Sequence, residues 1–339
     1  MALKVSIVGA TAYTSFELIR LLLRHPQVKI VHLGGRREGN PRVCDIFPAL
    51  RGLCDLQLTG LDPEEAPEKP DAAFFTLPHQ VSQDYVPKYL KAGIRCIDFS
   101  ADYRFDDLQT YRRHYGEHRD AANLPRAVYG IPELFRSRLR GAQLIGNPGC
   151  YPTSVALALA PLVRERLIDL GEVIVNSVSG VSGRGNKPEP GSMYCECNEN
   201  VAAYKIGAHR HEPEMEHALE LLGAGKPRIL FVPHLVPMDR GILSTIYARL
   251  LKDMSAGQLH EVCADFYRGE PFVRALPASE QPRTKDVSFT NLCDFACTPV
   301  HGGRVVVTSA IDNMTRGAAS QAVQNLNAAL GLDERLGIA

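Results

Sequence analysis

The stretch VSIVGATAYTSFELIRLLLRHPQVKIVHLGGRR, residues 5–37, decides the fold of the first part of the chain. Val5–Val8 is a short apolar run that ends at Gly9, which predicts a buried strand. Apolar residues at helical spacing fill Phe16–Arg24, and Val28–Leu33 is a second apolar run. A strand, a helix and a strand within about 30 residues form a βαβ unit.

The same alternation continues towards the middle of the chain. Further strands are predicted at Asp71–Leu77, Arg95–Phe99 and Gln143–Ile145. A helix at Ser82–Ala92 separates the first two and ends at Gly93. Strands that alternate with helices in this way predict an α/β, Rossmann-type doubly wound parallel sheet.

The pattern changes after an apolar helix predicted at Ser154–Arg166. Four strand-like segments follow, with longer connections between them: Val173–Val178, Arg228–Val232, Leu243–Leu250 and Gly303–Ile311. This change indicates a second, α+β domain built on a mixed or antiparallel sheet. The tail, Asn313–Leu330, is rich in alanine and glutamine and is predicted to be helical.

Composition limits the class of protein. A chain of 339 residues is long for one core, so we expect two domains. Its 38 basic side chains balance 38 acidic ones, so we expect no nucleic-acid partner. No run of about 20 apolar residues is present, which argues against a membrane span. The start of the chain lacks a secretory pattern, and nine irregularly spaced cysteines fit free thiols, so we expect a cytoplasmic protein. Cys195-x-Cys197 is too tightly spaced for the common zinc sites, and no metal is expected.

The turn between the first strand and the first helix, GATAYTS, is a candidate for binding a dinucleotide. Such a turn directs backbone N–H groups towards a pyrophosphate. Only the first glycine of the usual Gly-x-Gly-x-x-Gly pattern is present, although the later positions keep small residues. The alternative is a turn with one glycine and no ligand. The loop residues expected to bind the cofactor are Gly9, Thr11, Ala12, Tyr13, Thr14 and Ser15.

The end of the second strand favours one cofactor over another. Proteins that prefer NAD usually carry an acidic residue here, which holds the ribose diol. This chain has Arg36 and Arg37, with no carboxylate before Glu38. Arginine side chains suit a 2′-phosphate, so NADP(H) is favoured, and a solvated basic loop is the alternative.

The octet GNPGCYPT, Gly146–Thr153, is the most informative motif in the chain. Two glycines and two prolines fix the backbone on both sides of Cys150. The thiol lies just before the predicted apolar helix, where a helix N-terminus stabilises a thiolate and its amides can hold an oxyanion. We therefore interpret Cys150 as a nucleophile, with a buried structural cysteine as the alternative.

Two histidines are the candidate acid–base partners of this thiol. His209 and His211 flank Arg210 in the polar segment GAHRHEPE, Gly207–Glu214. The two imidazoles would share one face if the segment were extended, and Arg210 would then point elsewhere. The residues themselves do not choose between the two histidines.

Taken together, these motifs resemble the N-acetyl-γ-glutamyl-phosphate reductase family of arginine biosynthesis, which is related to aspartate-semialdehyde dehydrogenase. The resemblance covers nearly the whole chain. Further matching segments are LPH at 77–79, SADYR at 100–104, YGIPE at 129–133, SGVSG at 179–183, PHLVPM at 233–238, Arg240-Gly241, Asp312-Asn313, Gly317-Ala318 and QAVQN at 321–325. Departures from the family are Ala12 and Ser15 (usually glycine), Arg184 (shifted by one position) and Arg316 (usually lysine).

The resemblance implies a two-step reduction of an acyl phosphate. The Cys150 thiolate attacks the acyl carbon and expels phosphate, and NADPH then delivers hydride to the thioester and releases the semialdehyde. His209 is implied as the acid–base group, with His211 as the second candidate. Implied cofactor contacts are Pro78, Ser100, Gly183 and Asn313. Implied substrate contacts are Arg104, Asn147, Ser179, Lys205 and Arg210.

The resemblance also implies how the chain is organised. Residues 1–149 and 312–339 would form the domain that binds NADP(H), and residues 150–311 the catalytic and dimerisation domain. The partners would be a small acyl phosphate and further copies of the chain, in a homodimer or homotetramer. Two alternatives remain. The substrate could be a lysine-pathway aminoadipyl phosphate or, more distantly, aspartyl phosphate, and the protein could be a non-catalytic nucleotide-binding scaffold.

Overall fold

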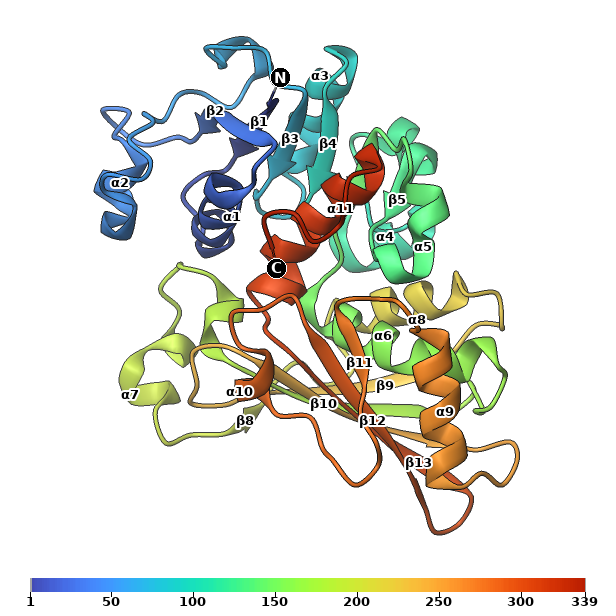
Figure 1. Cartoon of the computed structure of the whole chain (residues 1–339). Coiled ribbons are helices and arrows are strands. Elements are labelled where there is room, and N and C mark those ends of the chain that lie inside the picture. The colour runs from blue at the N-terminus through green and yellow to red at the C-terminus, as the bar shows by residue number, and fades with distance from the viewer. Residues whose placement is uncertain (1, 339) are drawn as a thin grey trace. The chain divides into compact units, whose positions relative to one another are not determined.

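The computed structural model describes residues 2–338, which fall into two compact units. One unit comprises the chain up to Pro148 together with the segment from Ala318 onward, and the other comprises Gly149–Gly317. Residues 312–317 thus lie in the second unit, whereas the boundary expected from the sequence lies before them. Figure 1 shows both units, with the C-terminal helix α11 (Ser320–Leu330) in red as part of the first one.

The first unit is built on a six-stranded parallel sheet, which confirms the predicted doubly wound α/β architecture. The strand order is β2-β1-β3-β4-β6-β5. This order reverses between β1 and β3, and ligands bind at the carboxyl ends of strands beside such a switch point. The strands are β1 (Leu3–Val8), β2 (Val28–Gly34), β3 (Ala72–Phe75), β4 (Arg95–Asp98), β5 (Ala127–Tyr129) and β6 (Leu144–Gly146).

Helices of the first unit follow the predicted alternation, with local differences. Besides α11, they are α1 (Tyr13–Arg24), α2 (Val43–Ile46), α3 (Val86–Lys91), α4 (Leu108–Tyr115) and α5 (Pro132–Leu139). The helix predicted at 82–92 is interrupted, because Pro87 lacks the N–H that a continuous helix would use, and a separate 3-10 turn at Ser82–Asp84 precedes α3. Helix α11 packs against α1 and α5 (Figure 1).

The second unit is built on a seven-stranded mixed sheet, as the change of pattern predicted. Its order is β11-β12-β13-β10-β7-β9-β8, in which β7/β9 and β11/β12 are parallel and the other neighbours antiparallel. The strands are β7 (Val173–Ser179), β8 (Ala202–Ala203), β9 (Ile229–Leu235), β10 (Ile242–Arg249), β11 (Val273–Ala275), β12 (Cys293–Val300) and β13 (Arg304–Ile311).

Helix α6 (Cys150–Arg164) is the central helix of the second unit. It contacts β10, β12 and β13 and also packs against helices α8 and α9 (Figure 1). Ser154, inside α6, hydrogen-bonds the hydroxyls of Ser244 at 3.1 Å and Ser309 at 3.0 Å, which ties the buried helix to the sheet. Within residues 2–338, no helix has the length and apolar character needed to cross a bilayer. The other helices are α7 (Tyr194–Cys197), α8 (Glu212–Glu220), α9 (Ala256–Phe266) and α10 (Thr284–Val287).

Candidate active site

The loop after β1 is shaped by Gly9. Its φ of 99° lies in the region that favours glycine, and a Cβ here would stand 2.9 Å from the carbonyl oxygen of Thr76. The amides of Gly9 and Ala10 both donate to the carbonyl oxygen of Gly34, at 2.9 Å each. The backbone is therefore held closely against the sheet, and α1 begins directly beyond it.

Ser15 replaces a glycine of the expected pattern without loosening this loop. Its side chain is fully buried, and the hydroxyl donates to the carbonyl oxygen of Gly9 at 2.8 Å and lies 2.9 Å from Thr76 Oγ1. It also accepts a hydrogen bond from the Ala12 amide at 3.3 Å. Because Ala12 is the N-cap and has no side chain that can cap α1, amides of the first helical turn can bind a phosphate. Loop contacts with a cofactor would therefore come mainly from the backbone.

An open cavity of about 590 Å³ lies beside the end of β2, within the size range of small-molecule sites. Arg36 and Arg37, the two arginines predicted to meet a 2′-phosphate, both line it. Arg36 Nη2 also donates to the hydroxyl of Tyr85 at 2.5 Å. Two guanidinium groups at an open cavity are groups that could hold an anionic part of a cofactor. The remaining lining residues are Gly35, Glu38, Asn40, Gly60, Leu61, Asp62 and Glu65.

Pro78 and Ser100 follow the adjacent strands β3 and β4. Pro78 is exposed, whereas Ser100 is buried and its hydroxyl donates to Asp98 Oδ2 at 2.5 Å. The same hydroxyl accepts from the Asp102 amide at 3.1 Å. Burial, and then the Asp102 carboxylate, raise the pKa of Asp98 above its ordinary value. Ser100 thus fixes the turn after β4, and Pro78 is the more accessible of the two for a cofactor.

Arg104 and Asn147, both expected to contact the substrate, contact each other. Arg104 Nε donates to the carbonyl oxygen of Asn147 at 2.8 Å, and its Nη2 donates to that of Phe99 at 2.6 Å. Asn147 is fully buried, and its amide donates to the carbonyl oxygen of Ala318 at 3.1 Å and accepts from Asn325 Nδ2 at 2.9 Å. The Asn147 side chain therefore holds α11 beside the strand that leads to the nucleophile motif.

Cys150 is the first residue of α6, so this helix begins four residues earlier than the predicted Ser154. Gly149 is its N-cap, and the hydroxyl of Thr153 donates back to the Gly149 carbonyl at 2.9 Å. The cysteine is partly exposed, whereas the helix beyond it is buried. The sulfur therefore lies at the positive end of a 15-residue helix dipole, which stabilises a thiolate.

A buried carboxylate lies beside the same turn. Glu214, in α8, is fully buried and accepts a hydrogen bond from the Gly149 amide at 2.8 Å. This contact fixes the N-cap, because it satisfies one of the amides that a helix start leaves without an intrahelical partner. The negative charge stabilises the helix but opposes a thiolate next to it, so the balance between the two sets the reactivity of Cys150.

The two candidate histidines lie beside Tyr151, the residue after the nucleophile. The Tyr151 ring centroid is 5.6 Å from that of His209 and 5.8 Å from that of His211, and the two imidazoles are 4.9 Å apart. His209 also contacts the rings of Tyr204 at 5.6 Å and Phe231 at 5.2 Å. The hydroxyls of the two tyrosines are 3.0 Å apart. The second unit thus brings the histidine pair to the start of α6.

The segment that carries the histidines consists of turns rather than an extended strand. Its geometry lets the amide of His211 donate to His209 Nδ1 at 3.1 Å. Because that nitrogen accepts, the neutral His209 ring carries its proton on Nε2. Burial, and then the charges of Lys205 and Arg210, lower the pKa of His209 to about 4. His209 is therefore neutral at pH 7 and presents a hydrogen-bond donor. Lys205 and Arg210 are both exposed.

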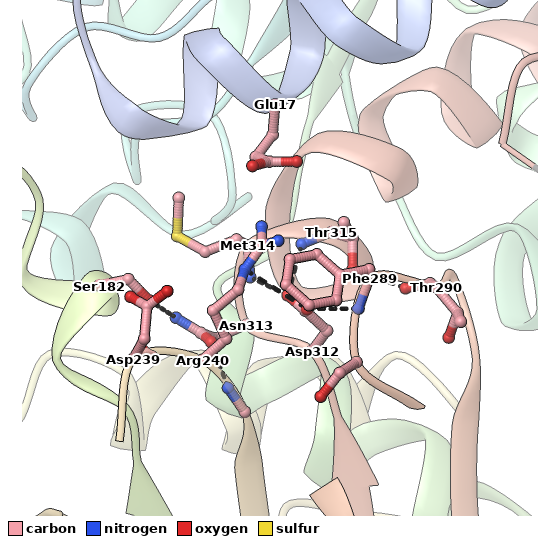
Figure 2. Close-up of polar contacts among 12 residues, drawn as sticks. Glu17, Ser182, Asp239, Arg240, Phe289, Thr290, Asp312, Asn313, Met314 and Thr315 are labelled. Carbon is pink, nitrogen blue, oxygen red and sulfur yellow. Dashed lines mark hydrogen bonds and ion pairs between the residues drawn. The ribbon is translucent and has the colours of Figure 1, made fainter. Parts of the chain in front are cut away.

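Figure 2 shows how Asp312 organises the segment that follows β13. Its fully buried carboxylate accepts hydrogen bonds from the amides of Met314 at 2.8 Å, Thr315 at 3.0 Å and Phe289 at 2.8 Å. It also forms an ion pair with Arg240 at 3.5 Å. One carboxylate thus joins two loops, and it was not assigned a role from the sequence.

Asn313, the next residue, links the same segment to the loop after β7 (Figure 2). Its Oδ1 accepts from the Gly241 amide at 2.7 Å, and its Nδ2 donates to the Ser182 hydroxyl at 3.0 Å. A Cβ on Gly183 would lie 3.4 Å from Asn313 Nδ2 and 3.5 Å from the hydroxyl of Ser179. The expected cofactor residues Gly183 and Asn313 and the expected substrate residue Ser179 are therefore neighbours.

The shifted arginine also belongs to this region. Arg184 lies over the ring of Tyr204, 5.2 Å from its centroid, and 3.9 Å from the carboxylate of Glu189. Tyr204 in turn contacts His209. A cation is therefore retained next to the histidine pair despite the shift in sequence.

Several site residues were missed by reasoning from the sequence. Tyr151 and Glu214 lie inside the motifs Gly146–Thr153 and Gly207–Glu214, so their positions in the sequence could have indicated a role in the site. Tyr204 lies in no recognised motif and acts through contacts distant in sequence. Asp312 lies in the matching segment Asp312-Asn313, but that match gave it no role. Within residues 2–338, no three His, Cys, Asp or Glu side chains are grouped so that they could hold a metal ion.

Comparisons with known proteins identify the family of the chain. Residues 4–142 match the family described as semialdehyde dehydrogenase, NAD binding domain, and residues 150–313 match semialdehyde dehydrogenase, dimerisation domain. A relative from Geobacter sulfurreducens is 48% identical over 338 residues, which is 99% of this chain and 98% of the relative. One from Desulforudis audaxviator is 47% identical with the same coverage. Both are called N-acetyl-gamma-glutamyl-phosphate reductase.

Solved structures share the fold. The crystal structure of aspartate semialdehyde dehydrogenase II from Vibrio cholerae superposes with a TM-score of 0.72 at 16% identity, over 96% of this chain and 98% of that one. Aspartate semialdehyde dehydrogenase with NADP from Candida albicans has a TM-score of 0.71 at 16% identity, over 97% and 98% of the two chains. At this level of identity the likeness establishes the fold alone.

Proposed function

Since the chain belongs to the family of N-acetyl-gamma-glutamyl-phosphate reductases, within the semialdehyde dehydrogenases, we propose that it reduces N-acetyl-L-glutamyl 5-phosphate to N-acetyl-L-glutamate 5-semialdehyde and phosphate. It is an oxidoreductase with a nicotinamide-cofactor domain. NADPH is the proposed reductant, and arginine biosynthesis the proposed pathway. The observation that carries the proposal is a partly exposed thiol at the start of a buried helix, with a histidine pair packed against the next residue, Tyr151.

Cys150 performs the first step. Its thiolate attacks the acyl carbon, a C–S bond forms, and the C–O bond to phosphate breaks with the electron pair leaving on phosphate. An ordinary thiol with a pKa near 8.5 is only a few per cent thiolate at pH 7, so the helix start is needed to raise that fraction. Amides of the first turn of α6 can stabilise the oxyanion that develops on the carbonyl oxygen.

The two histidines divide the proton chemistry. His209 is neutral with its proton on Nε2, so this N–H can donate a hydrogen bond to the carbonyl or phosphate oxygen of the substrate. We assign acceptance of the thiol proton to His211, whose ring packs against Tyr151, the residue after the nucleophile. Glu214, three residues further along in α8, accepts a hydrogen bond from the Gly149 amide. The family resemblance implied His209 as the acid–base group. We divide the roles because Nδ1 of His209 already accepts a hydrogen bond from the His211 amide.

The cofactor would be held mainly by the first unit. The first-turn amides of α1 would bind its pyrophosphate, and Arg36 and Arg37 its 2′-phosphate. When bound, the nicotinamide supplies the hydride that reduces the acyl carbon. In the second unit, Asn313 and Gly183 would contact the nicotinamide end. The match to a dimerisation domain supports a homodimer or homotetramer.

The substrate is tested by running the reaction in reverse. Aldehyde, phosphate and NADP⁺ are supplied, and reduction of the cofactor is followed at 340 nm for the N-acetylglutamyl, aminoadipyl and aspartyl aldehydes. The N-acetylglutamyl aldehyde is expected to give a kcat/KM at least about tenfold above the others, since one methylene is worth about 1–3 kcal/mol. A preference for another aldehyde would reassign the substrate, and no reaction with any of them would favour the scaffold reading.

A further inference from the structure

The cavity that would take the 2′-phosphate carries an unfavourable balance of charge. Arg36 and Arg37 supply two positive charges, but three carboxylates line the same cavity. A phosphate ester there would be repelled unless some of these carboxylates were neutralised and the arginines were held towards the ligand. The carboxylates are those of Glu38, Asp62 and Glu65.

Tyr85 holds Arg36 in place. The phenol is buried, with 6% of the residue exposed, and its hydroxyl accepts from Arg36 Nη2 at 2.5 Å. The guanidinium carbon lies 5.9 Å from the centroid of the same ring. A free arginine side chain loses rotamer entropy when it is fixed, so a partner that fixes it beforehand favours ligand binding.

Lys88 also lies near the Tyr85 ring. Its ammonium lies 5.1 Å from the centroid of Tyr85 and forms an ion pair with the Asp62 carboxylate. Asp62 is one of the three acidic residues that line the cavity. Both partners are exposed, so the pair contributes little to stability, but it removes one negative charge from the wall that faces the phosphate.

From this arrangement we propose that Tyr85 and Lys88 set the preference for NADP over NAD, with Tyr85 as the positioning residue of Arg36 and Lys88 as the group that neutralises Asp62. The proposal rests on the 2′-phosphate assignment made above. It extends that assignment to Tyr85, which is the N-cap of α3, and to Lys88, which lies within α3. Neither residue needs to touch the cofactor. Tyr85 acts through Arg36, so its effect must disappear when Arg36 is absent.

A double-mutant cycle tests this dependence directly. Affinities for 2′,5′-ADP and 5′-AMP are measured by calorimetry on the full chain, for the parent and for Arg36→Gln, Tyr85→Phe and the double variant. The readout is the ratio of the two affinities, which general damage to the fold does not change. Arg36→Gln is expected to lower the ratio about tenfold or more, and Tyr85→Phe about three- to tenfold. The double variant should equal Arg36→Gln alone.

The outcomes separate two failures. If Arg36→Gln leaves the ratio unchanged, the 2′-phosphate assignment and this inference fall together. If Arg36→Gln lowers the ratio but Tyr85→Phe does not, or if the two effects simply add, the assignment stands and the positioning role of Tyr85 is overturned.

Lys88→Gln tests the second half of the proposal. It is expected to lower the same ratio about two- to threefold, because Asp62 regains its charge beside the phosphate. Lys91→Gln, which removes an exposed lysine of the same helix, is the matched control and should leave the ratio unchanged. Equal effects of the two lysine variants would overturn the role of Lys88.

Discussion

Gly317 lies against the nucleophile so closely that a methyl group on its Cα would stand 2.6 Å from the Cβ of Cys150. Its amide donates to the carbonyl oxygen of Asp312 at 2.9 Å, and it belongs to the π-helical turn Thr315–Ala319. The backbone of the turn after β13 therefore forms one wall of the site, packed directly against Cys150. A side chain on this wall would displace either the turn or the nucleophile.

Gly317→Ala is accordingly expected to lower kcat/KM at least about tenfold and the free energy of unfolding by about 1–3 kcal/mol. Both are measured together with the rate at which iodoacetamide alkylates Cys150. Gly257→Ala is the matched control, because a methyl group there meets no atom within 4 Å. A Gly317→Ala variant with normal activity and stability would show that the wall does not constrain the nucleophile.

Ser15→Ala is expected to weaken NADPH binding about three- to tenfold. The buried hydroxyl that ties α1 to Gly9 and Thr76 is lost, and a buried hydrogen bond is worth about 1 kcal/mol. The dissociation constant is measured by NADPH fluorescence. Ser288→Ala removes a hydroxyl that bonds the carbonyl of Thr284 in the second unit, and should leave binding unchanged. Equal affinities for the parent and Ser15→Ala would rule out a role for this hydroxyl in shaping the loop.

The stability of the protein is expected to depend on the protonation of His209. Its pKa is about 4 in the folded chain and 6.5 ordinarily, so between these values the unfolded chain binds more protons. The free energy of unfolding should therefore rise as pH increases from about 4 to 6.5. Above about pH 6.5, His209 should no longer make the free energy of unfolding depend on pH. Urea unfolding of the parent and of His209→Asn measures it. The variant should show a shallower rise over this range, and an unchanged slope would mean that His209 is not held neutral.

Much of the fold could be predicted because it is encoded locally. In the βαβ unit at residues 5–37, two apolar runs predict the strands and apolar residues at helical spacing predict the helix between them. The tight turn at Gly9 is predicted because this glycine directly follows the first apolar run. The helix was predicted from Ser154, whereas α6 begins at Cys150; Pro152 lies in its first turn, where proline costs no hydrogen bond. Strand β12 was missed because its first five residues are all buried and show no alternation.

The site was predictable only as far as its motifs reach. Cys150 and the histidine pair stand in local patterns, whereas Tyr204 has no such pattern around it, and the matching segment Asp312-Asn313 does not show which groups Asp312 binds. The division of roles between the histidines depends on one hydrogen bond, from the His211 amide to His209 Nδ1, which arises from turns that the sequence did not indicate. Such contacts follow from the folded backbone and not from residue type.

The central claim is that Cys150 carries the acyl group as a thioester. The most direct measurement mixes the enzyme with the N-acetylglutamyl semialdehyde and NADP⁺ without phosphate, and follows NADPH formation and the intact mass of the protein. The account predicts a burst of one NADPH per subunit together with a hydroxylamine-sensitive N-acetylglutamyl adduct that maps to Cys150. It also predicts that Cys150→Ser gives neither while still binding NADPH. Turnover by Cys150→Ser, or an adduct on another residue, would contradict it.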